Sequence, residues 1–254
     1  MAFPNANPFA FRLQRRLVAL FLRKVHTRSC DTVLQSCIAL HVLLLASIFL
    51  HWSIDNQMSI DIHGMPSMSD VTKTLIELVR TRALRHGTFR LASGREAHFY
   101  LDAKQVILEA QGSTLVGQAI LERLLAVGPL PHAVGGMSIG ADPVTSAVVT
   151  MAGVLKYPLL GFLVRKQPKD HGTARCIEGP VQPGQRVVIV EDVVTTGGSS
   201  LLAIDRAIEF GLIVERVITL IDRLAGGREA ITARGIHFDS IMTIRDLGLE
   251  PLAE

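Results

Sequence analysis

The segment at residues 191–200 constrains the fold of this chain more than any other feature. It follows four consecutive Val and Ile residues, 187–190, a run typical of a strand covered on both faces. It begins with Glu191 and Asp192, continues with small and hydroxyl-bearing residues, and leads into a stretch of helical periodicity at 201–208. A buried strand, a small-residue turn and a helix in this order predict one βα unit of an α/β fold.

The residue types in this segment suit a sugar phosphate. Two carboxylates can accept hydrogen bonds from the vicinal hydroxyls of a ribose. The Thr and Ser hydroxyls, the glycine amides and the helix N-terminus can hold a phosphate dianion, and the glycines let the backbone approach it closely. Each part taken alone also fits an ordinary strand end, turn or helix cap. The whole string in one strand–turn–helix context favours the phosphate site.

Residues 191–200 resemble the motif with which type I phosphoribosyltransferases bind phosphoribosyl diphosphate (PRPP). The resemblance implies an α/β fold with a mainly parallel central sheet, flanking helices and a small N-terminal hood. A Walker loop fits poorly because no Gly-Lys-Ser/Thr follows, and the dinucleotide fingerprint GxGxxG is absent. The PRPP-binding residues that the resemblance implies in this segment are Glu191, Asp192, Val193, Val194, Thr195, Thr196, Gly197, Gly198 and Ser199.

A dense basic cluster at residues 165–172 follows another strand pattern and is the second informative motif. Taken alone, such a charge run also fits a solvated surface loop. Its sequence, Arg-Lys-Gln-Pro-Lys-Asp-His-Gly, resembles the catalytic loop of orotate phosphoribosyltransferases. The resemblance implies a homodimer in which loop 165–179 closes over PRPP in the partner's site. It also implies that Arg165, Lys166, Lys169 and His171 bind PRPP at its pyrophosphate, and that Lys169, His171 and Asp192 are catalytic.

Two further strings resemble the same family. Residues 89–104 resemble its N-terminal motif, a hairpin with Ser-Gly at its turn that covers the base. Asp222-Arg223 follows a strand pattern, and the family places an arginine here on the carboxylate of orotate, so Thr195 and Arg223 are expected to contact orotate. The chain departs from the family where several members carry lysines, because it has Ala92 in the hairpin and Ser138 or Ile139 in the pyrophosphate loop.

The resemblance implies a pentosyltransferase of pyrimidine biosynthesis, which converts orotate and PRPP to orotidine 5′-monophosphate and pyrophosphate. Mg²⁺ would be its cofactor, held mainly through PRPP and not by protein ligands. Two alternatives stay open: a phosphoribosyltransferase for another base, and a non-catalytic regulator that senses PRPP. Lys169 and His171 argue against the regulator, since a sensor has no need of a loop built for the leaving group.

The rest of the domain alternates strand and helix patterns, which predicts a mainly parallel sheet with helices on both faces. Asp142 and Pro143 resemble an N-cap followed by the first helical residue. Ligands of such sheets bind beyond the carboxyl ends of the strands, where loops 136–142, 165–179 and 192–199 are expected to lie. The predicted strands are 133–135, 159–164, 187–190, 217–221 and 238–244, and the predicted helices lie at 70–79, 112–124, 142–155, 201–208 and 227–234.

Residues 1–57 form an extension ahead of the phosphoribosyltransferase domain at 58–254. Residues 33–52 are apolar and long enough to span a bilayer, and six Lys and Arg residues precede them. The extension is interpreted as an upstream mis-assigned start, as a membrane anchor or targeting segment, or as an apolar helix packed on the domain. A cytoplasmic enzyme is expected. The net charge of +3 gives no case for binding nucleic acid.

Overall fold

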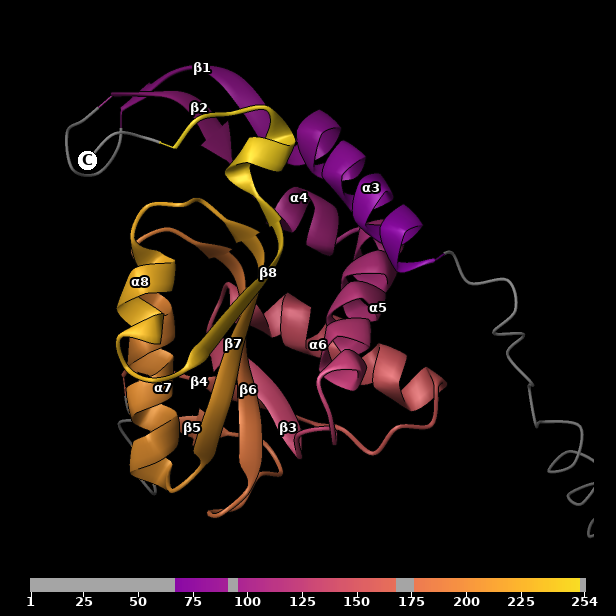
Figure 1. Ribbon diagram of the computed structural model, residues 1–254, viewed down its shortest axis with the longest axis vertical. Coiled ribbons are helices and arrows are strands. Elements are labelled where there is room, and N and C mark those ends of the chain that lie inside the picture. The colour runs from indigo at the N-terminus through magenta and orange to yellow at the C-terminus, as the bar shows by residue number, and fades with distance from the viewer. Residues whose placement is uncertain (1–66, 91–95, 168–175, 252–254) are drawn as a thin grey trace, which may run out of the picture. The chain divides into compact units, whose positions relative to one another are not determined.

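The computed structural model describes residues 67–90, 96–167 and 176–251, all of which belong to one compact unit, Ile62–Glu254 (Figure 1). The predictions for residues 1–57, including the apolar segment 33–52, lie outside the described residues. Across the described ranges, no helix is both long enough and apolar enough to cross a membrane.

A six-stranded sheet forms the centre of this unit, in the order β5-β4-β3-β6-β7-β8. All neighbouring pairs are parallel except β4 and β5, so the predicted mainly parallel sheet is confirmed. The strands are β3 (Ala133–Met137), β4 (Leu160–Val164), β5 (Ile177–Glu178), β6 (Arg186–Val194), β7 (Ile213–Asp222) and β8 (His237–Thr243).

Helices cover both faces of the sheet, as Figure 1 shows. Val188 and Val190 of β6 pack into the core on one face, and Val187 and Ile189 pack into the core on the other, each no more than 3 % exposed. Burial of each such side chain contributes about 1.5–3 kcal/mol. One face carries α3 (Met68–Leu78), α5 (Ala110–Ala126) and α6 (Ala141–Val154), and the other carries α7 (Gly198–Phe210) and α8 (Gly227–Thr232).

The chain changes direction across the sheet between β3 and β6. From β3 it runs through α6 to β4, whereas from β6 it runs through α7 to β7 on the other side. The β3–β6 pairing ends at Gly135 and Ile189, while β6 continues to Val194 beside β7. Open α/β sheets bind ligands at such a switch point, outside the carboxyl ends of the strands.

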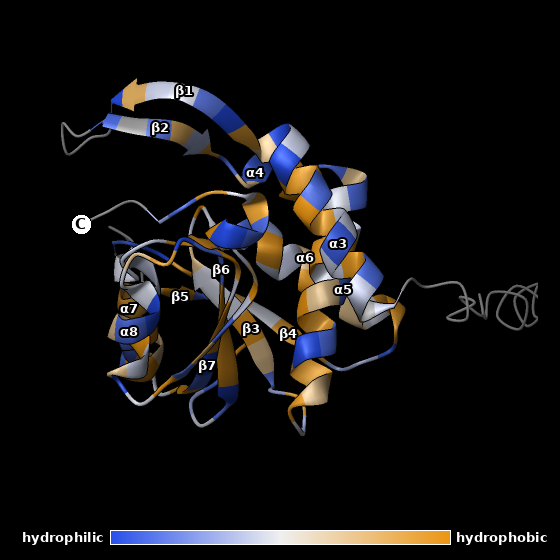
Figure 2. Ribbon diagram, turned by 45° about the horizontal axis from the view of Figure 1, so that its top comes forward, coloured by the Kyte–Doolittle hydropathy of each residue, from blue (hydrophilic) through white to orange (hydrophobic). Residues whose placement is uncertain are grey.

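A hood lies beyond this edge of the sheet (Figures 1 and 2). We use this name for the antiparallel strands β1 (Leu84–Arg90) and β2 (Glu96–Leu101) together with the short helix α4 (Lys104–Ile107). The hairpin predicted from the 89–104 string is confirmed, although its turn lies outside the described residues. Figure 2 shows the central strands in apolar colours and polar residues on the hood strands.

Several element boundaries differ from the predictions. Helix α6 begins at Ala141 with Gly140 in the N-cap position, so the prediction of Asp142 as N-cap is wrong; its carboxylate instead accepts a hydrogen bond from Ser138 Oγ at 2.8 Å. Strand β6 extends to Val194, because pairing with β7 continues past the apolar run. The sequence patterns also missed four short elements: the strand β5, a π-helical turn at Val79–Ala83, α4, and a 3₁₀-helix at Ile244–Leu247.

The packing of β3 predicts a large penalty for Gly135→Ala. A Cβ at this position would lie 2.1 Å from the carbonyl oxygen of Phe162 on β4, so the strands would have to separate. We expect a loss of about 3 kcal/mol or more and a fall in Tm of roughly 6 °C or more, measured by thermal unfolding. Gly153→Ala is the matched control, since a Cβ there meets nothing within 4 Å and should stabilise α6 by about 0.5–1 kcal/mol. Equal melting temperatures for the two variants would contradict the prediction.

Candidate active site

Two adjacent carboxylates lie near the end of β6. Alternation along the strand turns Glu191 toward the start of α7, where Ser200 Oγ donates to its Oε2 at 3.4 Å. It turns Asp192 toward the hood, where Oδ2 lies 3.6 Å from Lys104 Nζ, and Asp192 Oδ1 accepts the backbone N–H of Val193 at 2.9 Å. The residues are only 4 % and 9 % exposed, so each polar contact offsets part of the cost of burying charge.

Burial changes the protonation of Glu191. Removal from water, with the adjacent charge of Asp192, raises the pKa of Glu191 from its ordinary 4.5 to about 8. At neutral pH Glu191 is therefore mostly protonated and can donate a hydrogen bond, while the Asp192 carboxylate beside Lys104 accepts them. An acid pair with one donor and several acceptors is matched to the vicinal hydroxyls of a ribose, each of which both donates and accepts.

The loop 195–199 presents its polar groups to solvent at the N-terminus of the 13-residue helix α7. Thr196, Gly198 and Ser199 are exposed, and Gly197 takes a left-handed φ of +82° that glycine adopts without strain. The loop leans on Gly227 of α8, whose N–H donates to the carbonyl oxygen of Thr195 at 3.0 Å. The arrangement of hydroxyls and free helix amides is suited to a phosphate.

The loop after β3 lies against the same acid pair. A Cβ on Gly140 would be 2.8 Å from Asp192 Oδ1 and 2.9 Å from Glu191 Oε1, so only glycine fits here without displacing the carboxylates. Ser138 N donates to the carbonyl oxygen of Val164 on β4, which fixes the loop to the sheet. Loops from β3 and β6 therefore meet at the switch point.

Arg223 brings a cation to this edge from the end of β7. Its N–H donates to the carbonyl oxygen of Val194 at 2.9 Å, and its guanidinium lies 5.4 Å from the ring centroid of Phe99 in the hood. The turn is held by fully buried Asp222, whose Oδ2 lies 3.3 Å from Arg228. Burial lowers the pKa of Arg223, and no acidic side chain of the described residues pairs with it. The guanidinium is thus available to a ligand carboxylate.

Lys104 is a site residue that the sequence motifs did not identify. It begins α4, and its Nζ lies 3.3 Å from Asp102 Oδ1 as well as near Asp192. Partial burial works against its charge, but the charges of Asp192 and Asp102 prevail and raise the pKa of Lys104. The Asp-x-Lys spacing at the end of β2 was the sequence signal, although only the fold brings it to β6.

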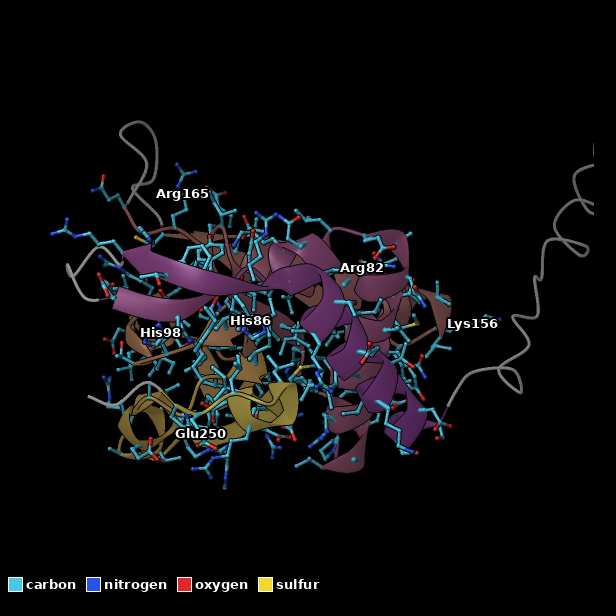
Figure 3. The ribbon with its side chains drawn as sticks, turned by 90° about the horizontal axis from the view of Figure 1, so that it is seen from above. Arg82, His86, His98, Lys156, Arg165 and Glu250 are labelled. Carbon is cyan, nitrogen blue, oxygen red and sulfur yellow. The ribbon has the colours of Figure 1, made fainter. Side chains whose placement is uncertain are left out.

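The predicted basic loop is described only in part. Arg165 and Lys166 follow β4 and are exposed, and Arg165 Nη1 lies 3.6 Å from Glu178. Figure 3, which looks down on the hood, shows Arg165 at one margin of the unit. Lys169 and His171 lie outside the described residues, so their predicted roles stay predictions.

The described residues offer no preassembled metal centre, because nowhere in 67–90, 96–167 and 176–251 do three or more His, Cys, Asp or Glu side chains group as ligands. Because Glu191 is mostly protonated at neutral pH, the acid pair leaves the Asp192 side chain as its donor for a metal ion. One carboxylate fits Mg²⁺ held mainly through substrate phosphates, since this ion is commonly bound by one or two carboxylates together with such phosphates.

A cavity of about 250 Å³ opens at the opposite, amino-terminal edge of the sheet and is a poor candidate for the same chemistry. Two of the arginines that line it already pair with acids, Arg123 with Asp239 and Arg186 with Glu215. None of the residues predicted to bind substrate lines it.

Comparisons with known proteins agree with this geometry. No family model matches the chain. The chain is 52 % identical over 181 residues to an orotate phosphoribosyltransferase of Rhodopirellula baltica, covering 70 % of this chain and 94 % of that relative. It is 40 % identical over 181 residues to one of Synechocystis sp., covering 71 % and 90 %. A solved orotate phosphoribosyltransferase of Mycobacterium tuberculosis in complex with PRPP is 37 % identical, with a TM-score of 0.60 over 70 % of this chain and 99 % of that one.

The raised pKa of Glu191 predicts how stability depends on pH. Below about pH 4.5 this group is protonated in both states. Between about pH 4.5 and 8 it ionises only in the unfolded chain, so rising pH destabilises the folded state. Glu191→Gln removes this penalty and should gain a few kcal/mol over wild type, roughly 2–5, as pH rises from 5 to 8. Chemical denaturation across this range measures it, with exposed Glu209→Gln on α7 as control. A constant difference between Glu191→Gln and wild type would contradict the assigned pKa.

Proposed function

Because the chain belongs to the orotate phosphoribosyltransferase family, we propose that its site joins orotate to the ribose of PRPP and releases pyrophosphate. The N1–C1 bond of orotidine 5′-monophosphate forms as the C1–O bond to pyrophosphate breaks. The electron pair of the C1–O bond leaves with the pyrophosphate, and the proton on N1 of orotate is released to solvent. The observation that carries the proposal is the meeting of three features at one edge of the sheet: the acid pair, loop 195–199, and Arg223, with which no acid of the described residues pairs.

PRPP is held, in this proposal, by β6 and the turn that follows it. Glu191 and Asp192 bind the ribose hydroxyls, one as donor and one as acceptor. Residues 193–199 surround the 5′-phosphate with amides and the hydroxyls of Thr195, Thr196 and Ser199. The N-terminus of α7 adds its partial positive charge, which is worth about 0.3–1 kcal/mol to an anion.

Orotate is held from β7 and the hood. Arg223 has a planar guanidinium that can take the orotate carboxylate through two parallel hydrogen bonds, and its partial burial strengthens them. Phe99 beside it provides an apolar wall. Thr195 is the proposed second contact to the base.

The leaving pyrophosphate needs positive charge, because negative charge grows on it while C1 becomes oxocarbenium-like. Arg165, Lys166, Lys169 and His171 are the proposed source, with Lys169 the main catalytic residue and His171 able to donate a proton. Mg²⁺ bound mainly through PRPP would add positive charge at the same oxygens.

We also propose a homodimer in which loop 165–179 of one subunit serves the other's site, and a cytoplasmic location, where PRPP is available.

A phosphoribosyltransferase for another base and a PRPP-sensing regulator remain the competing proposals. The cation at Arg223, which has no acidic partner among the described residues, favours an anionic base over adenine, hypoxanthine or uracil, because none of these carries a carboxylate. A regulator that only senses PRPP would have no need of the basic loop at residues 165–172, which suits a departing pyrophosphate.

Turnover of orotate by the purified full chain tests the proposal. We expect orotate absorbance to fall when PRPP and Mg²⁺ are present, and no product with uracil, adenine or hypoxanthine in parallel reactions. The Met58–Glu254 fragment, assayed beside it, shows whether the extension contributes. Turnover of a different base would identify that base, and not orotate, as the substrate. A folded chain that binds PRPP but converts none of these bases would favour the regulator.

The role proposed for Arg223 predicts a selective loss. Arg223→Gln should raise KM for orotate about tenfold or more, since a bidentate charged contact is worth roughly 1.5–3 kcal/mol, and should leave KM for PRPP within about twofold. Surface Arg234→Gln, which alters an arginine paired with Asp205 beyond α8, is the control. Equal increases in both KM values would show that Arg223 supports the whole site and not orotate alone.

A further inference from the structure

Lys104 occupies a position that none of the substrate contacts proposed above uses. It is the first residue of α4, and its ammonium group lies between Asp102 Oδ1 at 3.3 Å and Asp192 Oδ2 at 3.6 Å. Its side chain is 42 % exposed, so solvent and ligands reach it. It joins the hood directly to the ribose-binding acid pair.

The contacts of Lys104 fix its backbone, while the contact of its ammonium group with Asp192 can be broken by a ligand. Asp102 Oδ1 accepts the backbone N–H of Lys104 at 3.2 Å, and Asp102 Oδ2 accepts Gln105 Nε2 at 3.1 Å. Asp102 is thus fixed by several donors. Partial burial acts to raise the pKa of Asp102, but these hydrogen bonds and the charge of Lys104 outweigh it and lower the pKa. The contact to Asp192, at 3.6 Å, is longer than a hydrogen bond and is the one that a ligand can displace.

The stereochemistry of PRPP puts its diphosphate beside Lys104. In an α-ribofuranosyl diphosphate, the group on C1 projects from the same ring face as the 2- and 3-hydroxyls. A ribose whose hydroxyls bind Asp192 therefore directs its diphosphate into the space around that carboxylate. This space lies between Lys104, near Asp192 Oδ2, and the loop at Gly140, near Asp192 Oδ1.

The loop on the far side of Asp192 brings no positive charge to a diphosphate. Its residues are Ser138, Ile139 and Gly140. Arg165, the first residue after β4, has its guanidinium near Glu178 in this structure. Among the described residues, Lys104 is accordingly the cation with an ion pair to the acid pair, at 3.6 Å from Asp192 Oδ2.

We propose that Lys104 is a diphosphate-binding residue: it pairs with Asp192 while the site is empty and transfers to the diphosphate of PRPP when ribose hydroxyls take over the Asp192 oxygens. The inference rests on the proposed function for the identity of the ligand. It gives the hood a direct part in holding the leaving group, in addition to covering the base.

A competing role is purely positional, in which Lys104 only orients Asp192. The two roles differ for ligands that have a ribose but lack a diphosphate. Ribose 5-phosphate uses the acid pair and loop 195–199, whereas inorganic pyrophosphate uses the diphosphate region alone. A diphosphate contact affects PRPP and pyrophosphate, whereas a positional role affects every ligand that carries the ribose.

Binding and kinetics of Lys104→Met in the full chain test the inference. We expect Kd for PRPP and for pyrophosphate to rise about tenfold or more in calorimetry, with Kd for ribose 5-phosphate and KM for orotate within about twofold of wild type. Lys104→Arg should recover most of the PRPP affinity. Lys73→Met, which removes an exposed lysine 3.9 Å from Asp70 on α3, is the matched control.

The outcomes separate clearly. Equal weakening of PRPP and ribose 5-phosphate would assign Lys104 to positioning and overturn the diphosphate contact, as would unchanged pyrophosphate binding. Thermal unfolding checks that the variants fold, and Lys104→Gln replaces Lys104→Met if the latter does not. Failure of wild type to turn over orotate would defeat the proposed function but leave the binding comparison intact, so the two failures are distinguishable.

Discussion

The cost of burying two neighbouring carboxylates at the end of β6 is the constraint on which the rest of the site depends. Two like charges this close cannot both stay ionised in an apolar strand end. The fold reduces this cost differently for the two acids. Glu191, near Ser200, stays protonated, whereas Asp192 has the cation of Lys104 beside it. Gly140 then lets a second loop close over both acids. The two acids differ because consecutive residues of a strand point to opposite faces, so each side chain meets different neighbours.

The sheet topology explains why charged groups from distant segments meet here. Strands β3 and β6 pair only up to Gly135 and Ile189, and the loops that follow them lie side by side. Strand β7 places Arg223 next to these loops. The opposite edge carries the same kinds of residues, but two of its arginines, Arg123 and Arg186, are already paired with Asp239 and Glu215. Position in the topology, more than composition, distinguishes the two edges.

Local signals predicted the βα units, because a run such as 187–190 and the glycines after it act within one short stretch of chain. The hydrogen-bonded pairing that extends β6 to Val194 comes from β7 and could not be seen locally. Lys104 was missed for a similar reason, since its partner Asp192 lies on a strand far along the sequence. Asp142 was misassigned because Ser138, and not the helix, engages its carboxylate.

Gly227 shows that the conformation of loop 195–199 depends on packing against α8. It lies on α8, yet a Cβ there would be 2.6 Å from the carbonyl oxygen of Thr195 and 3.0 Å from the amide nitrogen of Gly197. A side chain at Gly227 would therefore push against the backbone of the loop that follows β6. The conformation of loop 195–199 thus depends on a helix outside the acid pair, because any side chain at the first residue of α8 would displace the loop.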